Sequence, residues 1–307
     1  MANKTGKSRD RLTFRKSIKG YLFILPWLIG FVGIMLGPML FSLYASFNVY
    51  NITNLMKWRG FRNYLTIFTN DNIFPTVIYN TAYYVLFSVP LAVIFALILA
   101  LLLNTKVKGI GIFRTVFYVP SVLSGVAVAL LWWWVFNPFG GLINNFLAII
   151  HIQGPGWFND PNWSKPALIV TRMWGVGGSM ILFLAAFQDV PRTLYEACEI
   201  DGAKGLKKFF HITLPLISPT MLYVIVTGVI GAFQTFDNAY IISQGDGRPE
   251  NSMLFYMIYL YRKAFIQGQM GYACALAWVL FVIIMIITGI QLLISRRWVY
   301  YEGGGQS

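Results

Sequence analysis

Long apolar runs separated by short polar segments dominate the pattern of this chain. A transmembrane helix needs about 20 apolar residues, and six runs reach that length. The six runs are residues 20–47, 81–103, 115–136, 167–187, 217–236 and 272–295. The first run is longer than the apolar core of about 7 to 15 residues of a signal peptide, so we expect it to be retained as a span. The pattern predicts an all-α, polytopic membrane protein with six transmembrane helices and both termini on the same side.

The composition agrees with this fold class. Hydrophobic residues make up 57% of the 307 residues and charged residues only 11%, whereas soluble domains are about a quarter charged. A formal net charge of +13 would suggest nucleic acid as the partner of a soluble protein. Here the basic residues lie in the tails and in short loops beside the apolar runs, so we expect membrane lipid as a partner and no nucleic acid.

The distribution of Lys and Arg predicts the orientation. The side that holds both termini carries 16 of these residues, against 7 on the opposite side, although the loops there are longer. Basic residues favour the cytoplasmic side of a membrane. We therefore expect a polybasic cytoplasmic tail at residues 1–19, a transmembrane domain at 20–300 and a second cytoplasmic tail at 301–307.

A polar island, residues 190–215, separates the fourth and fifth runs, and we call it the elbow. Pro191 suits the first turn of a helix, Thr193 is a candidate cap, and Gly202 supplies a stop or a sharp bend. A basic stretch follows, and Pro215 marks the entry to the next apolar run. The pattern predicts a short helix, a turn and a second helix at the cytoplasmic face.

The elbow carries a resemblance to a known family. The positions concerned are Glu196, Ala197, Asp201, Gly202, Ala203, Ile212, Leu214 and Pro215. Their spacing resembles the signature loop of permease subunits of binding-protein-dependent ABC importers. The resemblance implies the type I ABC importer permease fold and a loop that docks onto the ATPase. Cys198 departs from the family's Glu-Ala-Ala, but it is small and weakly polar, and we expect docking to tolerate it.

Residues 54–64 and 243–247 also look like their counterparts in carbohydrate permeases of this family. An ordinary amphipathic loop between two helices remains the alternative for the elbow. An uncharged sugar is bound by amides, hydroxyls and aromatic faces rather than by ion pairs. Such groups, where they recur at helical spacing, are therefore candidate contacts for a transported sugar.

In the fifth run, Gly231, Gln234, Thr235 and Asn238 fall at positions i, i+3, i+4 and i+7. A continuous helix would present them on one face. They correspond to positions where the maltose-type permease contacts its substrate, and the resemblance therefore implies that they line the substrate pathway. Small and polar residues also serve helix packing in membranes, and both roles stay open.

In the fourth run, the resemblance assigns Trp174, Gly175 and Gly178 to the same pathway, although the relatives' aromatic residue is missing at Gly178. Trp174 could stack on a sugar ring, and the glycines would leave room for it. Two charges lie within the runs, Arg172 and Asp237, and lipid makes such charges costly. We expect Arg172 to extend outward to the membrane surface and Asp237 to be hydrated.

The chain has no visible chemical machinery of its own. No Gly-x-x-x-x-Gly-Lys-Ser/Thr loop, which would bind nucleotide phosphates, occurs. The two cysteines, Cys198 and Cys274, lack metal-ligand spacing, and no hydrolase motif is present. We expect no enzyme activity, no metal and no cofactor bound by this chain, with ATP and Mg used by a partner ATPase.

These observations and the resemblance together predict a permease subunit of a carbohydrate ABC importer in a bacterial inner membrane. The expected partners are a second, homologous permease subunit of different sequence, two ATPase subunits, an extracytoplasmic binding protein and an oligosaccharide. A different solute, such as a glycerol phosphate, is the alternative within the same class. An ion-coupled secondary transporter is a further alternative, but it calls for ionisable groups at mid-membrane and often for repeat symmetry, and neither is evident.

Overall fold

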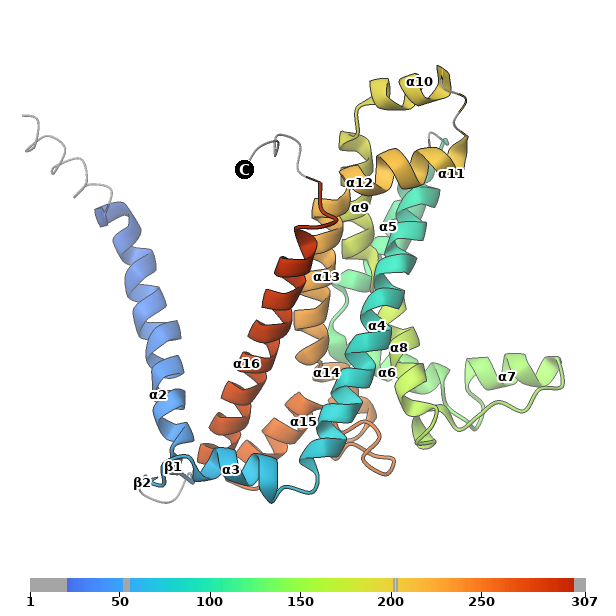
Figure 1. Ribbon diagram of the computed structural model, residues 1–307. Coiled ribbons are helices and arrows are strands. Elements are labelled where there is room, and N and C mark those ends of the chain that lie inside the picture. Colours follow the sequence, from blue (N-terminus) through green and yellow to red (C-terminus); the bar gives the residue numbers. More distant parts are fainter. Residues whose placement is uncertain (1–20, 52–55, 106, 201, 203, 301–307) are drawn as a thin grey trace, which may run out of the picture.

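The protein is described by a computed structural model that covers residues 21–51, 56–105, 107–200, 202 and 204–300. This part of the chain is almost entirely helical (Figure 1). Its helices that are long and apolar enough to cross a membrane are Tyr21–Ser46, Phe74–Leu103, Ser218–Ile242 and Met270–Ser295. Two further candidate spans are bent pairs, Ile110–Val122 with Gly125–Val135 and Ser164–Trp174 with Gly177–Asp189. The described residues thus contain four such helices, or up to six spans if each bent pair crosses once.

The elements follow one another in a simple order. The first span contains a π-helical segment, η1 (Phe31–Leu36), and α2 (Gly37–Ser46), and a hairpin of β1 (Asn48–Val49) with β2 (Lys57–Trp58) follows. The next elements are α3 (Arg62–Thr69), α4 (Phe74–Leu103), α5 (Ile110–Tyr118), η2 (Val119–Val122), α6 (Gly125–Val135), α7 (Leu142–Ile149) and η3 (Trp157–Asn159). The remaining elements are α8 (Ser164–Trp174), α9 (Gly177–Asp189), α10 (Arg192–Ile200), α11 (Gly205–Lys208), η4 (Phe209–Thr213), α12 (Leu214–Leu216), α13 (Ser218–Phe233), α14 (Asp237–Ile242), α15 (Tyr256–Tyr261), η5 (Arg262–Ile266) and α16 (Met270–Ser295).

The boundaries of the predicted spans need correction in three places. The third and fourth runs were expected to form continuous helices, but they are bent by 102° and 48°, respectively, at short breaks. In the third, Ser124 takes an extended conformation and its hydroxyl caps α6 by accepting from the Ala127 N–H (3.3 Å). The second span starts at Phe74 rather than at residue 81, and Asn80 and Thr81, the polar residues buried in its first part, are bonded inside the protein.

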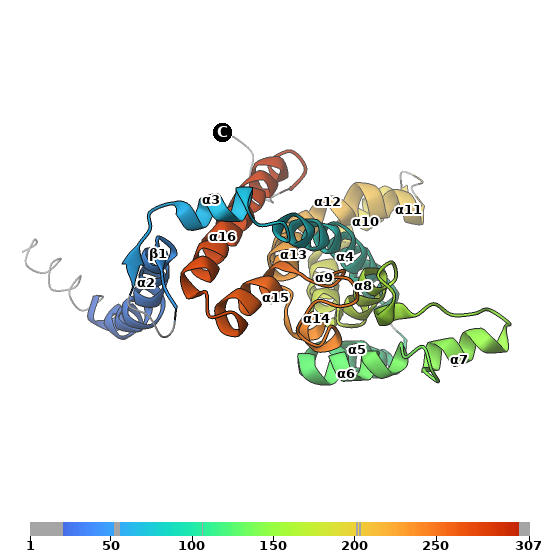
Figure 2. The same cartoon turned by 90° about the horizontal axis from the view of Figure 1, so that it is seen from below.

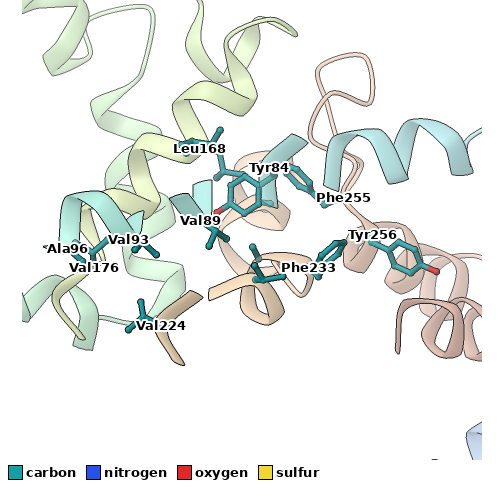
Figure 3. Close-up of a cluster of buried hydrophobic side chains, with 14 of the residues drawn as sticks. Tyr84, Val89, Val93, Ala96, Leu168, Val176, Val224, Phe233, Phe255 and Tyr256 are labelled. Carbon is teal, nitrogen blue, oxygen red and sulfur yellow. The ribbon is translucent and has the colours of Figure 1, made fainter. Parts of the chain in front are cut away.

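Helix α4 lies at the centre of the bundle and packs against α8, α9 and α13 (Figure 1). Its inward side chains, including Tyr84, Val89 and Val93, contribute to a continuous apolar core. Figure 3 shows this core reaching Phe233 at the end of α13 and Phe255 just before α15. The rings of Tyr84 and Phe255 are 5.3 Å apart. Burial of these side chains against several helices fixes α4 as the axis of the fold.

Two ends of the bundle can be distinguished. The elbow lies at one end, which we call the elbow end, together with the start of the first span and the end of α16 (Figure 1). The opposite end, the loop end, holds the β-hairpin, α3 and α15 (Figure 1). The first span packs on the rest of the protein through α2 and α16, and no residue of its most apolar window is buried.

At the loop end, polar side chains attach α4 to the segment before α15. Asn80 Nδ2 donates to the carbonyl of Asn251 (2.7 Å), and Lys165 Nζ donates to Asn80 Oδ1 (3.0 Å). Thr81 Oγ1 accepts from the Tyr256 N–H (2.9 Å). Each of these polar groups is paired, as burial among apolar helices requires.

Asp71 joins three further elements at the same end. Its carboxylate accepts hydrogen bonds from the hydroxyls of Tyr259 and Tyr272, and from the backbone N–H of Ile73 (3.0 Å). The Lys263 ammonium lies over the rings of Tyr259 and Tyr272. Partial burial works to raise the pKa of Asp71, but the hydrogen bonds from the two tyrosines outweigh it and hold the pKa below its ordinary value.

The break in the fourth span contacts the break in the third. A Cβ atom built on Gly177, the first residue of α9, would lie 2.5 Å from the carbonyl oxygen of Phe117 and 2.7 Å from Cα of Tyr118. Both are backbone atoms, which cannot move aside cheaply. A Cβ on the neighbouring Gly178 would meet nothing within 4 Å. Only glycine therefore allows α9 to approach α5 this closely.

We expect Asp71→Asn to lower the stability of the loop end by about 1 to 2 kcal/mol at neutral pH. The substitution replaces the carboxylate, which accepts two charge-assisted hydrogen bonds, by a neutral amide that accepts weaker ones. A carboxylate with a lowered pKa stabilises the fold above its ordinary pKa, and this stabilisation is lost as the pH falls through the lowered value. Wild-type thermal stability should therefore decline below about pH 3.8. Tryptophan fluorescence melts measure both effects. Asp189→Asn, which changes an exposed carboxylate at the end of α9, is the matched control and should leave the neutral-pH melt unchanged.

We expect Gly177→Ala to destabilise the protein by about 1 to 3 kcal/mol, because the added methyl group collides with the backbone of α5. Gly178→Ala, one residue further on, adds the same group in open space and should leave the melting temperature unchanged or slightly raised, since alanine favours a helix. Thermal melts of the two variants in the same detergent make the comparison. Equal melting temperatures would contradict the close approach of α5 and α9.

Candidate functional site

The elbow folds as two short helices joined at a bend. Helix α10 begins directly after Pro191, and four residues separate its end from the start of α11. Gly202, between them, has φ +73°, a left-handed conformation that glycine adopts without strain. Its N–H donates to the carbonyl of Glu199 (3.0 Å). The predicted helix, bend and second helix are therefore present in the structure. Asp201 and Ala203 lie outside the described residues.

Two side-chain contacts connect the arms of the elbow. Lys208 Nζ forms an ion pair with Glu199 Oε1 at 2.5 Å, which joins α11 to α10. The hydroxyls of Tyr195 and Thr213 are 2.8 Å apart and join α10 to η4. The ion pair is exposed on its Glu199 side and contributes little by itself, but the two contacts together define the angle between the arms.

The elbow presents apolar side chains to its surroundings. Ile200 is 88% exposed and Leu206 is 76% exposed, and Leu194 and Phe210 are exposed as well. These four residues form what we call the apolar elbow surface. Exposed apolar groups gathered on one polar, charged segment are typical of a protein interface.

The remaining predicted elbow residues divide between surface and core. Glu196 and Ala197 are exposed on α10. Cys198 is half-buried and packs against the apolar core. Pro215 is half-buried in α12, where the chain enters α13. The elbow thus places Glu196 and Ala197 on its outside, and Cys198 and Pro215 on the side that faces the bundle.

Three spans are interrupted, and their breaks gather in one region. Besides the breaks in the third and fourth spans, the fifth ends as α13 at Phe233 and restarts as α14 at Asp237. The start of α6 packs against α14, where a Cβ atom on Gly125 would lie 3.2 Å from Cβ of Asp237. Figure 1 and Figure 2 both show α14 beside α6. Irregular backbone at membrane depth is tolerated where it is buried in protein or lines a water-filled cavity.

The break in the fifth span corrects one prediction. Gly231, Gln234, Thr235 and Asn238 were expected on one face of a continuous helix, but Gln234 ends α13, Thr235 lies in the break and Asn238 belongs to α14. The periodicity argument for a shared face is therefore wrong. The residues lie instead at the interruption itself, where Gln234 is exposed and the side-chain oxygen of Asn238 is buried without a partner among the described residues.

The predicted residues of the fourth span also lie at a break. Trp174 is the last residue of α8, and its ring packs edge-to-face on Trp132 of α6 (5.9 Å). Gly175 follows it at the bend and Gly178 lies one residue inside the start of α9, both exposed. Trp174 thus joins two of the interrupted spans, while the glycines leave open backbone beside it.

Arg172 does not extend outward, and the expectation that it would reach the membrane surface is wrong. Its Nη2 donates to the carbonyl of Gly228 in α13 (2.9 Å), and its guanidinium lies 5.8 Å from the centre of the Tyr84 ring. Gly175 and Ser179 line the same small cavity of about 120 Å³. The guanidinium turns inward because a carbonyl and an aromatic face are available inside the bundle. Asp237 is exposed, in agreement with its expected hydration.

Sequence reasoning missed two features of this region. The break in the third span was not predicted, although Pro120 and the pair Ser124-Gly125 are signals of a stop and a new helix start. The role of Gly177 was also missed, because its neighbour Gly178 carries no such contact and the sequence alone does not distinguish the two. Both features bring separate spans into contact.

Comparison with known proteins identifies the family. Residues 88–300 match the family described as binding-protein-dependent transport system inner membrane component. The match covers most of the second predicted span, the four spans that follow it and the whole elbow.

Curated relatives extend the similarity to nearly the whole chain. The probable ABC transporter permease protein YesP of Bacillus subtilis is 41% identical, covering 97% of this chain and 98% of that protein. The lactose transport system permease protein LacF of Rhizobium radiobacter is 34% identical, covering 94% and 98%. The resemblance to carbohydrate permeases is therefore confirmed over almost the full length.

A solved structure shares the fold. One chain in the crystal structure of a bacterial alginate ABC transporter, in complex with an alginate pentasaccharide-bound periplasmic protein, has a TM-score of 0.80 and 25% identity. The similarity covers 93% of this chain and 96% of that chain. This protein belongs to the family of binding-protein-dependent transport system inner membrane components and is a permease of the ABC transporter type.

Proposed function

We propose that this chain is one of two permease subunits of a carbohydrate ABC importer. In this proposal, the two permeases enclose the pathway of an oligosaccharide that an extracytoplasmic binding protein delivers. A separate pair of ATPase subunits binds ATP and Mg and drives transport through the elbow. The family membership supports an importer subunit over the ion-coupled secondary transporter.

The observation that carries the proposal is the apolar elbow surface. Ile200 of α10 and Leu206 of α11 are 88% and 76% exposed, and both helices project from the bundle at the elbow end (Figure 1). Beyond the end of the spans the surroundings are aqueous, so apolar side chains exposed there favour a partner that covers them. An ATPase groove that receives α10 and α11 would do so, with Gly202 forming the tip of the inserted bend.

The proposed orientation follows from charge. The elbow end carries the excess of Lys and Arg, so it becomes the cytoplasmic end. The start of the first span and the end of α16 also lie at this end (Figure 1), which supports six crossings with each bent pair counted once. The loop end then faces the binding protein.

A second permease is supported by surfaces that this chain leaves uncovered. The most apolar window of the first span buries no residue within the protein. Gly178 and Gly231 lie exposed beside the breaks, and neither has a neighbour within 4 Å of a built Cβ atom. A homologous subunit packed against this side would close a pathway lined by the breaks of both chains.

The carbohydrate cargo is supported by the relatives and by the chemistry at the breaks. The relatives include permeases named for lactose and for arabinooligosaccharides. Gln234, Thr235 and Asn238 offer amide and hydroxyl groups beside Trp174, Gly175 and Gly178, and such groups bind sugar hydroxyls and ring faces. The unpartnered oxygen of Asn238 is buried in this state, so it would accept from a sugar hydroxyl only after the breaks rearrange.

In the proposed mechanism the ATPase pair closes on ATP and moves the elbow. Helix α9 ends two residues before α10 begins, and its first residue lies at the break of the fourth span. Movement of the elbow therefore reaches the pathway through one short helix. The breaks rearrange between an outward-open and an inward-open state, and the binding protein supplies the sugar in the first.

The position of Arg172 supports a second candidate function. In it, the chain belongs to an importer of the same class whose cargo bears an acidic group. Within the described residues no carboxylate pairs with this guanidinium, which lines a cavity with Gly175 and Ser179. A charge inside a span is costly, and such charges commonly serve the transported solute. A glycerol phosphate or an acid-bearing sugar would supply the missing anion.

We expect Leu206→Glu to separate the ATPase from the permease pair, because a charge in the centre of the docking surface leaves an unpaired carboxylate in the groove. Co-purification of the ATPase and ATP-driven uptake into proteoliposomes should both fall at least about tenfold. Ile149→Glu replaces a residue of equal exposure, 74%, on α7 at the loop end. This control should retain the ATPase, and loss of the ATPase in both variants would contradict docking at the elbow.

We expect Arg172→Gln to distinguish the two cargo classes in uptake assays. For a neutral oligosaccharide, the variant should transport at a similar rate, because glutamine can still donate to the Gly228 carbonyl. For a cargo with an acidic group, uptake should fall about tenfold or more through loss of a charge-assisted hydrogen bond. Arg172→Lys keeps the charge and should restore part of the acidic-cargo transport. Unchanged uptake of acidic cargo in Arg172→Gln would remove the second candidate.

A further inference from the structure

A polar cavity of about 550 Å³ lies at the elbow end, between the end of α4, the start of α5 and the junction of α9 with α10. Two arginines, Arg114 and Arg192, line it. Asn104, Thr105 and Gln188 add amide and hydroxyl groups. The cavity is separate from the breaks and from the apolar elbow surface, so the proposed transport cycle gives it no role.

The positive charges of this cavity have no carboxylate partner in the described part of the chain. Neither arginine takes part in the two ion pairs formed there. Arg114 Nη2 donates to the carbonyl of Leu103 (2.9 Å), but its Nε is buried and finds no acceptor among the described residues. Arg192 makes no side-chain hydrogen bond within those residues. Two guanidinium groups that face one cavity repel each other, and an anion between them removes that cost.

The cavity lies at the level where the apolar helices end. The apolar span α4 ends at Leu103, and the next two residues already line the cavity. On the α9 side, Phe187 and Val190 provide an apolar wall. The cavity therefore places basic and amide groups next to apolar ones at a membrane boundary. Basic pockets of this kind between transmembrane helices bind lipid headgroups.

We propose that this cavity is a binding site for a phosphate group, held by Arg114 and Arg192. Arginine binds phosphate through two parallel N–H···O bonds, and the neighbouring amides supply further donors. The volume exceeds that of a bare phosphate ion and accommodates a substituted one. An anionic phospholipid of the cytoplasmic leaflet and a soluble phosphate compound carry the same recognised group.

The site would connect the elbow to the bundle. Arg192 and Tyr195 belong to α10, whereas Asn104 and Thr105 directly follow the end of α4 and Arg114 belongs to α5. A bound phosphate group bridges these two parts and resists their separation. This consequence rests on the proposed coupling role of the elbow, whereas the binding site itself does not.

Binding is tested on the complete importer, purified with its ATPases and placed in nanodiscs. Nanodiscs of phosphatidylcholine with added phosphatidylglycerol test the lipid source, and native mass spectrometry counts the retained phosphatidylglycerol. Nanodiscs of phosphatidylcholine alone, dialysed against radiolabelled inorganic phosphate, test the soluble source. We expect the double variant Arg114→Gln, Arg192→Gln to reduce binding of one probe at least about tenfold, which corresponds to one charge-assisted hydrogen bond.

The control is a double variant, Lys108→Gln with Lys207→Gln, which removes the same charge from exposed positions outside the cavity. It should retain the probe, because binding depends on the two arginines of the cavity and not on the general attraction of a positively charged surface for anions. Arg192→Gln alone should lose part of the binding and guards against misfolding, since the Arg192 side chain makes no hydrogen bond or ion pair within the described residues. The proposal is overturned if neither probe binds, or if both double variants lose binding equally. Because binding is measured without transport, this outcome is independent of the cargo.

Discussion

Every backbone N–H and C=O group at membrane depth needs a partner, because lipid offers no water to replace a missing hydrogen bond. This constraint makes the interrupted helices the most informative part of the protein. Each break is closed locally: the Ser124 hydroxyl caps α6, the Gly175 N–H donates to the carbonyl of Arg172, and the Thr235 N–H donates to that of Ala232. The chain can then expose polar side chains at mid-span without leaving its backbone unpaired.

The same constraint explains how the few polar and charged side chains of the bundle are used. Asn80 and Arg172 donate directly to backbone carbonyls of neighbouring segments, and Lys165 donates to Asn80. In a low-dielectric interior such bonds are directional and hold one arrangement of the helices. Apolar packing around α4 supplies the bulk of the contact, while these bonds determine which segment lies against which.

The apolar runs located the four long apolar helices and the two bent pairs in their order along the chain, because length and hydropathy decide which segments are candidates to cross a membrane. The elbow was also predictable, since Pro191 and Gly202 act through local backbone geometry. The breaks were not, because an interruption of two residues leaves the hydropathy of a run almost unchanged. The direction of Arg172 depended on a carbonyl at Gly228, 56 residues away, and periodicity within one helix carries no information about such a contact. The residues assigned to the pathway were found by resemblance, and their location at the breaks came from the structure.

Helix α9 has one end beside the break in the third span and the other at the elbow. Gly177 lies against the backbone of α5 with no side chain between them, so this end cannot slide or rotate without carrying α5 with it. The helix is 13 residues long, about 20 Å from end to end. A movement at one end of this helix is therefore carried to the other end, where Gly177 makes the contact with α5. A substitution that widens this contact would separate α9 from α5 at one end and leave the residues of the elbow at its other end unchanged.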